Sequence, residues 1–108
     1  MTKRVDFTKA FVTGNIDHIM LSQLEGKPSH GYGLITSIRE EYQVYLGPST
    51  VYPSLNWLEE HGLLRSHWDL GKGKPKKIYL ITEKGKQAVR HQRMAIRQIL
   101  SKMVEVTC

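Results

Sequence analysis

The sequence has little cysteine, few acidic residues and no long apolar run. Its single cysteine, Cys108, is the last of 108 residues, so no internal disulfide can form, which fits a reducing compartment. No apolar stretch approaches the roughly 20 residues that span a bilayer, and the basic N-terminus lacks the apolar segment of a secretory signal. We therefore expect a cytoplasmic protein of one domain's length without a membrane partner.

The shortage of acidic residues leaves an excess of positive charge. Ten aspartates and glutamates stand against 16 lysines and arginines, for a net charge of +6 and an isoelectric point near 9.6. This balance favours anionic partners, with nucleic acid first and an acidic membrane surface second.

Patterns typical of catalysis or metal binding are also missing. The five histidines are scattered, without the spacing to another His or Cys that a metal site needs. Glu59 and Glu60 are adjacent, so they point to different faces instead of forming a catalytic pair. Gly71 and Gly73 lack the strand-to-helix context of a nucleotide loop. The sequence predicts no enzyme, no metal site and no cofactor.

Apolar residues at helical spacing predict helices in the first half of the chain. Residues 1–13 form a short amphipathic helix or an arm that docks on the rest. Asn15 is a plausible cap of a first firm helix, and Ser29 of a second. Gly31 and Gly33, costly inside that second helix, indicate close approach by another backbone or a ligand.

The third helix, within residues 47–63, has two unlike faces. Val51, Leu55 and Leu58 form an inward stripe. The outer face carries hydroxyl, amide and aromatic groups with no carboxylate before Glu59, which suits the major groove of DNA. An ordinary amphipathic helix with a polar outer face is the alternative. The candidates for base or sugar contacts are Ser49, Thr50, Ser54, Asn56 and Trp57, and Tyr52 is a candidate phosphate contact.

Proline and glycine mark the limits of this helix. Pro48 suits its first position, and Gly62 ends it. Pro53 removes one hydrogen bond and should loosen or kink the early turns.

Two β-like runs follow, over residues 64–69 and 77–81, and the loop between them is rich in glycine and lysine. Together they predict a hairpin with a longer loop. Its lysines can lie along a phosphate backbone or reach a minor groove, or they can simply keep a sheet edge soluble. The candidate contacts are Lys72, Lys74, Lys76 and Lys77.

Thr82 caps a long last helix, with Glu83 in its first turn. Its apolar positions alternate spacings of three and four, which favours a dimer seam over packing on the domain's own core. The residues of this seam are Val89, Gln92, Ile96, Ile99, Met103 and Val106. A two-fold dimer would read an inverted repeat with half-sites about one helical turn apart.

Three helices followed by a hairpin predict an α+β, mostly α fold: a winged helix-turn-helix with a long C-terminal dimerisation helix. Residues 1–82 would form the DNA-binding domain with its N-terminal helix or arm, and residues 83–108 the dimerisation helix.

Several segments resemble the PadR family of transcriptional regulators. Residues 28–32 contain its His-Gly-Tyr signature, and residues 46–55 contain its recognition-helix signature with Tyr52-Pro53. The resemblance covers about residues 14–86. It implies a dimeric winged-helix DNA-binding protein, usually a repressor, in which Tyr32 lies near a phosphate and the residues around Tyr52 touch DNA. Ser29, His30 and Pro53 therefore join the candidate DNA-binding residues.

Two departures from the family pattern concern the helix start and the effector. Gly47 stands where the family often has a serine cap, which implies a looser helix start. Some small members stack flat drugs on a tryptophan of the last helix, where this chain has Ile96, and no aromatic residue follows Tyr79. Whether a small-molecule effector binds stays open. An architectural or replication-type DNA binder, and a protein-interaction module, are the alternative functions.

Overall fold

The computed structural model describes the backbone of residues 2–104 and the side chains of residues 6–104. Helix α1 (Thr2–Gly14) leads into α2 (Ile16–Gly26), and a short strand β1 (Ser29–His30) precedes α3 (Gly31–Tyr42). Helix α4 (Pro48–Glu60), the hairpin of β2 (Leu64–Asp69) and β3 (Lys76–Ile81), and the long helix α5 (Glu83–Met103) complete the chain. The predicted α+β, mostly helical fold is confirmed. No helix in the described part of the chain is long and apolar enough to cross a membrane.

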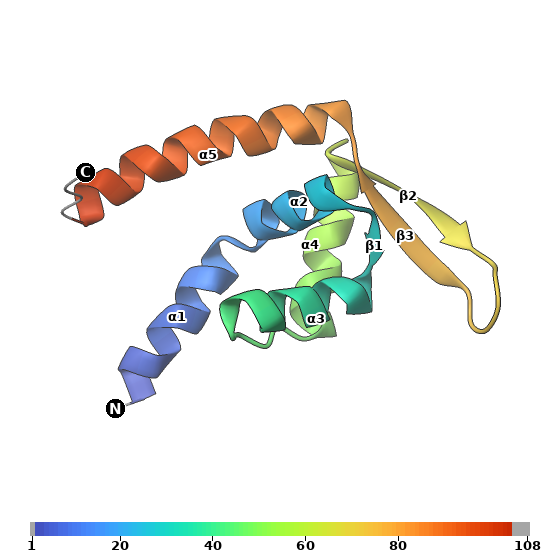
Figure 1. Ribbon diagram of the computed structural model, residues 1–108, viewed down its shortest axis with the longest axis horizontal. Coiled ribbons are helices and arrows are strands. Elements are labelled where there is room, and N and C mark those ends of the chain that lie inside the picture. Colours follow the sequence, from blue (N-terminus) through green and yellow to red (C-terminus); the bar gives the residue numbers. More distant parts are fainter. Residues whose placement is uncertain (1, 105–108) are drawn as a thin grey trace.

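The core lies where α2, α3 and α4 meet the sheet and the first turns of α5 (Figure 1). Met20 and Leu21 of α2, Ile38 of α3 and Leu55 of α4 are completely buried. The inward stripe predicted for residues 51, 55 and 58 is confirmed, since all three side chains have no exposed surface.

The sheet has three antiparallel strands in the order β1-β3-β2. Leu64 pairs with Ile81 at the base of the hairpin, and Asp69 pairs with Lys76 at its outer end. Strand β1 pairs through Ser29 and Tyr79. Tyr79 is almost fully buried and anchors the sheet to the helices.

The sequence predicts that Ser29 caps α3, and this prediction is wrong because Ser29 belongs to strand β1. The Ser29 backbone pairs with β3, so the helix begins one residue later and His30 is its N-cap residue, without a side-chain capping bond. Asn15 is the N-cap residue of α2, as predicted, but its side chain makes no capping hydrogen bond. The Asn15 amide instead donates to the carbonyl of Phe11 in the preceding turn (2.7 Å).

Two other expectations about helix ends have mixed outcomes. Thr82 caps α5 as predicted, because its hydroxyl accepts a hydrogen bond from Gly85 N (3.0 Å). Helix α4 runs unbroken through Pro53, although this proline has no N–H to donate to Ser49. Pro48 takes the first position of α4, and Gly62, with φ at +77°, follows the helix in the left-handed region.

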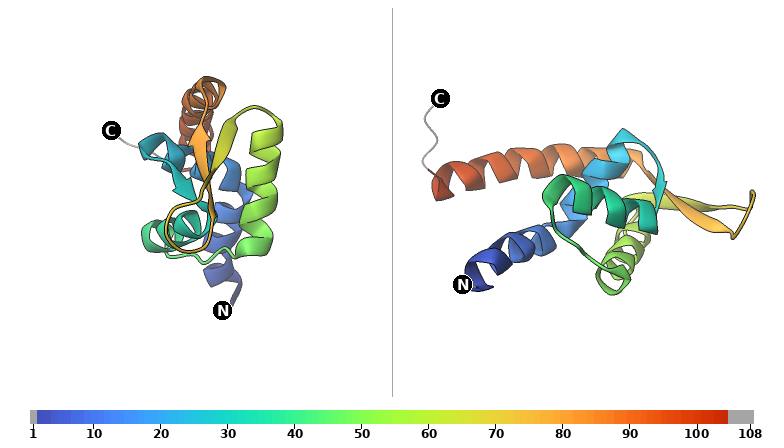
Figure 2. Two further views of the ribbon diagram at one scale, coloured as in Figure 1. Left: turned by 90° about the vertical axis from the view of Figure 1, so that its right-hand side faces the viewer. Right: turned by 60° about the horizontal axis from the view of Figure 1, so that its bottom comes forward.

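The hairpin projects at one end of the molecule, α4 lies across the middle, and the free ends of α1 and α5 point to the other end (Figures 1 and 2). The first half of α5, as far as Gln92 and Arg93, packs on α2, and its second half extends beyond the core. Val106 and Cys108 lie outside the described residues.

Candidate nucleic-acid interface

The outer face of α4 is exposed along its length. Ser49, Pro53 and Asn56 are exposed, and Thr50 is half-buried. The Trp57 indole is 47% exposed and stacks on the His61 ring, with ring centroids 3.8 Å apart. The first three turns of this helix therefore present polar and aromatic groups to solvent without a carboxylate.

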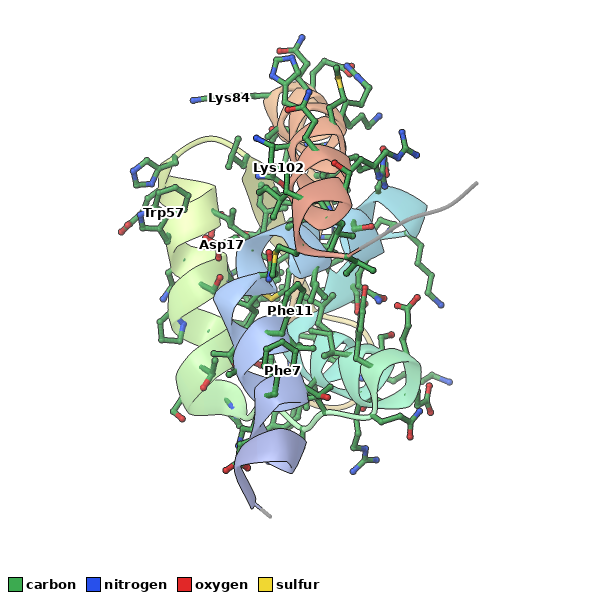
Figure 3. All side chains as sticks on the ribbon, turned by 90° about the vertical axis from the view of Figure 1, so that its left-hand side faces the viewer. Phe7, Phe11, Asp17, Trp57, Lys84 and Lys102 are labelled. Atoms are coloured by element: carbon green, nitrogen blue, oxygen red, sulfur yellow. The ribbon has the colours of Figure 1, made fainter. Side chains whose placement is uncertain are left out.

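Ser54 differs from the other α4 candidates because its hydroxyl already has a partner. It donates a hydrogen bond to Asp17 Oδ1, at the start of α2. Figure 3 shows Asp17 between α2 and α4. In this arrangement the Ser54 hydroxyl proton points into the protein and not toward a bound nucleic acid.

Tyr52 is the link between α4 and the start of α3. Its ring lies directly over Gly31, where any Cβ atom would overlap the phenol, and it meets Tyr32 edge to face at 6.5 Å between centroids. The expected close approach at Gly31 is thus made by a side chain. Burial, and secondarily the nearby Tyr32 phenol, raise the pKa of Tyr52, so it stays a neutral O–H donor at physiological pH.

A hollow of about 510 Å³ opens between the start of α3, Tyr52 and the hairpin. Tyr32, 61% exposed, stands on one side, and lysines of the hairpin stand on the other. Neutral phenols and ammonium groups are suitable donors to phosphate oxygens. The residues that line the hollow are His30, Gly31, Tyr32, Tyr52, Trp68, Lys74, Pro75, Lys76, Lys77 and Tyr79.

The lysines of the hairpin do not form one uniform group. Lys72, Lys74 and Lys76 are exposed at the tip, which turns at Gly73 with φ at +90°. Lys77 instead lies back toward the core, with Nζ 3.4 Å from Glu59 Oε1 and 5.6 Å from the centre of the Tyr79 ring.

Glu59 and Trp68 are two residues of this surface that sequence reasoning did not select. Glu59 holds both strands of the hairpin against α4, because its other carboxylate oxygen accepts a hydrogen bond from Ser66 Oγ (2.5 Å). No local pattern indicates such a role, since both partners come from later strands. Trp68 is 61% exposed beside the hollow. Trp68 lies two residues after Ser66 and four after Leu64 on β2, so the period of two along a strand could have placed it on the same face of the sheet.

The opposite end of the molecule holds an apolar groove between α1 and the distal half of α5. Figure 3 looks toward this end, with Phe7 and Phe11 on α1 below α5. Exposed apolar side chains line it, including Phe7 at 62%, Ile99 at 52% and Met103 at 60% exposure.

The predicted seam of α5 is divided between this groove and the interior. Val89 is fully buried in the core of its own chain. The prediction that it contacts a partner chain is therefore wrong. The Gln92 amide oxygen accepts a hydrogen bond from His18 Nδ1 (2.7 Å). Ile96, Ile99 and Met103 line the groove. The groove also takes aromatic rings from Phe7, Phe11 and Tyr42, on elements outside that seam.

Three helices and a hairpin, with an exposed face of the third helix beside a lysine-bearing loop, define a winged-helix protein of the DNA-binding type. The family model of the PadR-like transcriptional regulators matches residues 20–91. The chain therefore belongs to the PadR-like family of transcriptional regulators.

Solved structures agree with this assignment. A PadR family transcriptional regulator from Eggerthella lenta is similar with a TM-score of 0.82 and 29% identity, over 94% of this chain and 86% of that chain. A transcriptional regulator from Clostridium thermocellum shares the fold with a TM-score of 0.80 at 22% identity, over 92% and 99%. No curated protein shows significant similarity.

A third structure includes nucleic acid. Bacillus subtilis PadR in complex with operator DNA matches with a TM-score of 0.66 and 25% identity, over 71% of this chain and 45% of that chain. A protein of the same family and fold thus binds DNA.

Proposed function

We propose that the protein is a dimeric transcriptional repressor that binds an inverted-repeat operator and blocks polymerase at a promoter. One observation carries the proposal: the outer face of α4 has no carboxylate before Glu59, and Tyr52 of the same helix lines a hollow together with lysines of the hairpin. A helix of this kind enters the major groove, and a basic wing contacts the neighbouring backbone. The operator complex of Bacillus subtilis PadR supports the same use of the fold.

In this proposal the candidate residues have separate tasks. Ser49, Thr50, Asn56 and Trp57 contact bases or sugars in the major groove, and Pro53 lies on the same exposed face. Tyr32 and Tyr52 contact a phosphate at the hollow, which His30 also lines, and Ser29 precedes His30 in β1. The wing is the β2–β3 hairpin, and its exposed Lys72, Lys74 and Lys76 contact the phosphate backbone of the DNA.

The groove between α1 and α5 supports the dimer. Ile96, Ile99, Met103 and the phenylalanines of α1 expose apolar surface there, and burying such surface favours association. In this proposal the residues up to 82 form the DNA-binding unit, and α5 (Glu83–Met103) together with the apolar face of α1 forms the dimer contact. We place such a repressor in the cytoplasm, as the sequence predicts.

The test is a titration of the purified protein against the DNA upstream of its own gene, at several salt concentrations and with unrelated competitor DNA. A regulator prefers one inverted repeat, with log K falling against log salt by about 0.9 per phosphate contacted. The same slope without sequence preference would indicate an architectural binder. No binding at low salt would overturn the proposal in favour of a protein-interaction module.

Wing contacts are tested by replacing Lys72 and Lys74 with alanine. Because these lysines are exposed at the tip, the variant should bind all DNA sequences more weakly. The salt slope should fall by about 4 for a dimer, which loses two phosphate contacts in each subunit. Lys102→Ala, at the far end of α5, is the matched control and should leave the slope unchanged.

A further inference from the structure

Two adjacent residues in the first turn of α2 have partners on different helices. Asp17 accepts a hydrogen bond from Ser54 Oγ on α4. His18 donates from Nδ1 to Gln92 Oε1 on α5, at 2.7 Å. Both contacts are partly buried, and α2 packs against α4 and α5 as well.

Asp17 and His18 also lie between the apolar groove and α4. His18 lines the groove between α1 and α5. A smaller hollow beside it is lined by Asp17, His18 and Gln92 together. Figure 3 shows Asp17 on the α4 side of α2. One turn of α2 therefore contacts the end of the molecule that exposes apolar surface and the second turn of α4.

We propose that Asp17 is a positioning residue for the recognition helix, and that the Asp17–His18 pair transmits displacements of α5 to α4. This inference rests on the proposed function, because it assigns α4 the reading of DNA. Ser54 is then an anchor of the recognition helix instead of a base reader.

A purely electrostatic role and a positioning role for Asp17 predict opposite changes in DNA affinity when Asp17 is replaced. A carboxylate beside a DNA-reading helix repels phosphates, so its removal alone should tighten binding to every DNA. Loss of a positioning contact instead weakens binding to the specific site only, because the exposed groups of α4 no longer meet the bases in register. Packed helices also shift as units. A movement of α5 would therefore pass through the hydrogen bond between Gln92 and His18 to the first turn of α2, and so to Asp17.

The positioning role is tested with Asp17→Ala, Ser54→Ala and the double variant, by fluorescence anisotropy on operator and unrelated DNA. Each single variant should bind the operator about fivefold more weakly, and the double variant no more weakly than either. Asp17→Asn keeps an acceptor for Ser54 but removes the negative charge, so it should lose no affinity for the operator and should bind every DNA as tightly as the original protein or more tightly. Tighter binding by Asp17→Ala, or additive losses, would overturn the positioning role.

The transmission is tested without DNA, by the amide NMR spectrum of Gln92→Ala. The amide signals of residues 49–52 and 54–56 should shift in this variant and stay in place when the substitution is made in the Asp17→Ala background. Gln87→Ala removes an exposed amide from the same helix and should shift none of them. Equal shifts in both backgrounds, or none in either, would refute the transmission from α5 to α4. A folded protein that shows the expected shifts but binds no DNA would refute the proposed function and leave the transmission standing.

Discussion

At the scale of single residues, Tyr52 shows how a side chain connects core and surface. Its hydroxyl end lies against Gly31, its ring edge meets Tyr32, and one side faces the hollow beside the wing. A tyrosine is neutral at physiological pH at its ordinary pKa of about 10, and burial raises the pKa of Tyr52 further. A neutral O–H beside lysines donates to phosphate without adding a repelling charge.

Gly31→Ala should displace this ring, because the new Cβ atom would occupy the place of the Tyr52 phenol. We expect a loss of about 1–3 kcal/mol in the free energy of unfolding, measured by urea denaturation. Gly26→Ala, where a Cβ atom would meet nothing within 4 Å, is the control and should not destabilise. If Gly31→Ala costs as much in a Tyr52→Ala background, the contact with the ring is not the cause.

Asn56→Ala should relax sequence preference if its exposed amide reads a base. A bidentate amide contact discriminates between bases by about 1–3 kcal/mol, so binding to the operator should fall while binding to unrelated DNA holds. The measurement is the ratio of the two dissociation constants. Gln98→Ala, an exposed amide on α5, should leave the ratio unchanged, and an unchanged ratio for Asn56→Ala would remove it from the base contacts.

At the scale of elements, α2 and α5 are joined by an ion pair at the surface. Arg93 Nη2 lies 2.5 Å from Glu25 Oε1 and 3.4 Å from Ser22 Oγ. The hydrogen bond from Arg93 holds the pKa of Glu25 below its ordinary value. The stability that this pair contributes is therefore complete above the ordinary glutamate pKa, about 4.3, and is lost as the pH falls through the lowered value.

Glu25→Gln should remove this component of the acid sensitivity. Urea denaturation between pH 7 and pH 3 should show a smaller fall in stability below about pH 4.3 for Glu25→Gln than for the original protein. Glu60→Gln, at an exposed position on α4, serves as the comparison. Identical pH profiles for the original protein and Glu25→Gln would show that the pair adds nothing to stability.

Elements with a strong local signal were predictable from the sequence, and those that depend on distant partners were not. The Thr82 cap, the hairpin and the inward stripe of α4 follow from local patterns that the structure confirms. Strand β1 is only two residues long and exists because β3 offers a free edge to Ser29. No pattern within residues 28–30 encodes that edge.

The same division applies to the candidate site. The exposure of Ser49 and Asn56 follows from helical periodicity, which the sequence displays. The partners of Ser54 and Lys77 do not, since they are brought together by tertiary packing. Val89 was misassigned for a related reason: a heptad pattern does not distinguish the core of the same chain from a partner chain.

At the scale of the whole molecule, the groove between α1 and α5 should control assembly. Ile99→Glu places a charge on exposed apolar surface of the groove, and burying an unpaired charge in an interface is costly. We expect a dimer mass for the original protein and a monomer mass for the variant, by light scattering at micromolar concentration. Met94→Glu, on equally exposed α5 surface outside the groove, should remain dimeric. A monomeric original protein would contradict the assignment.

Helix α5 is one continuous rod of 21 residues between the core and the groove. Each residue advances a helix by 1.5 Å and turns it by 100°. One residue inserted between Gln92 and Ile96 would therefore rotate the apolar end away from α1. Seven inserted residues would nearly restore its orientation and lengthen the rod by about 10.5 Å. Helix α1 would not lengthen with it, so Ile96, Ile99 and Met103 would be carried about 10.5 Å past the phenylalanines of α1. We therefore expect even a seven-residue insertion to weaken the proposed dimer, measured as a smaller dimer fraction by light scattering.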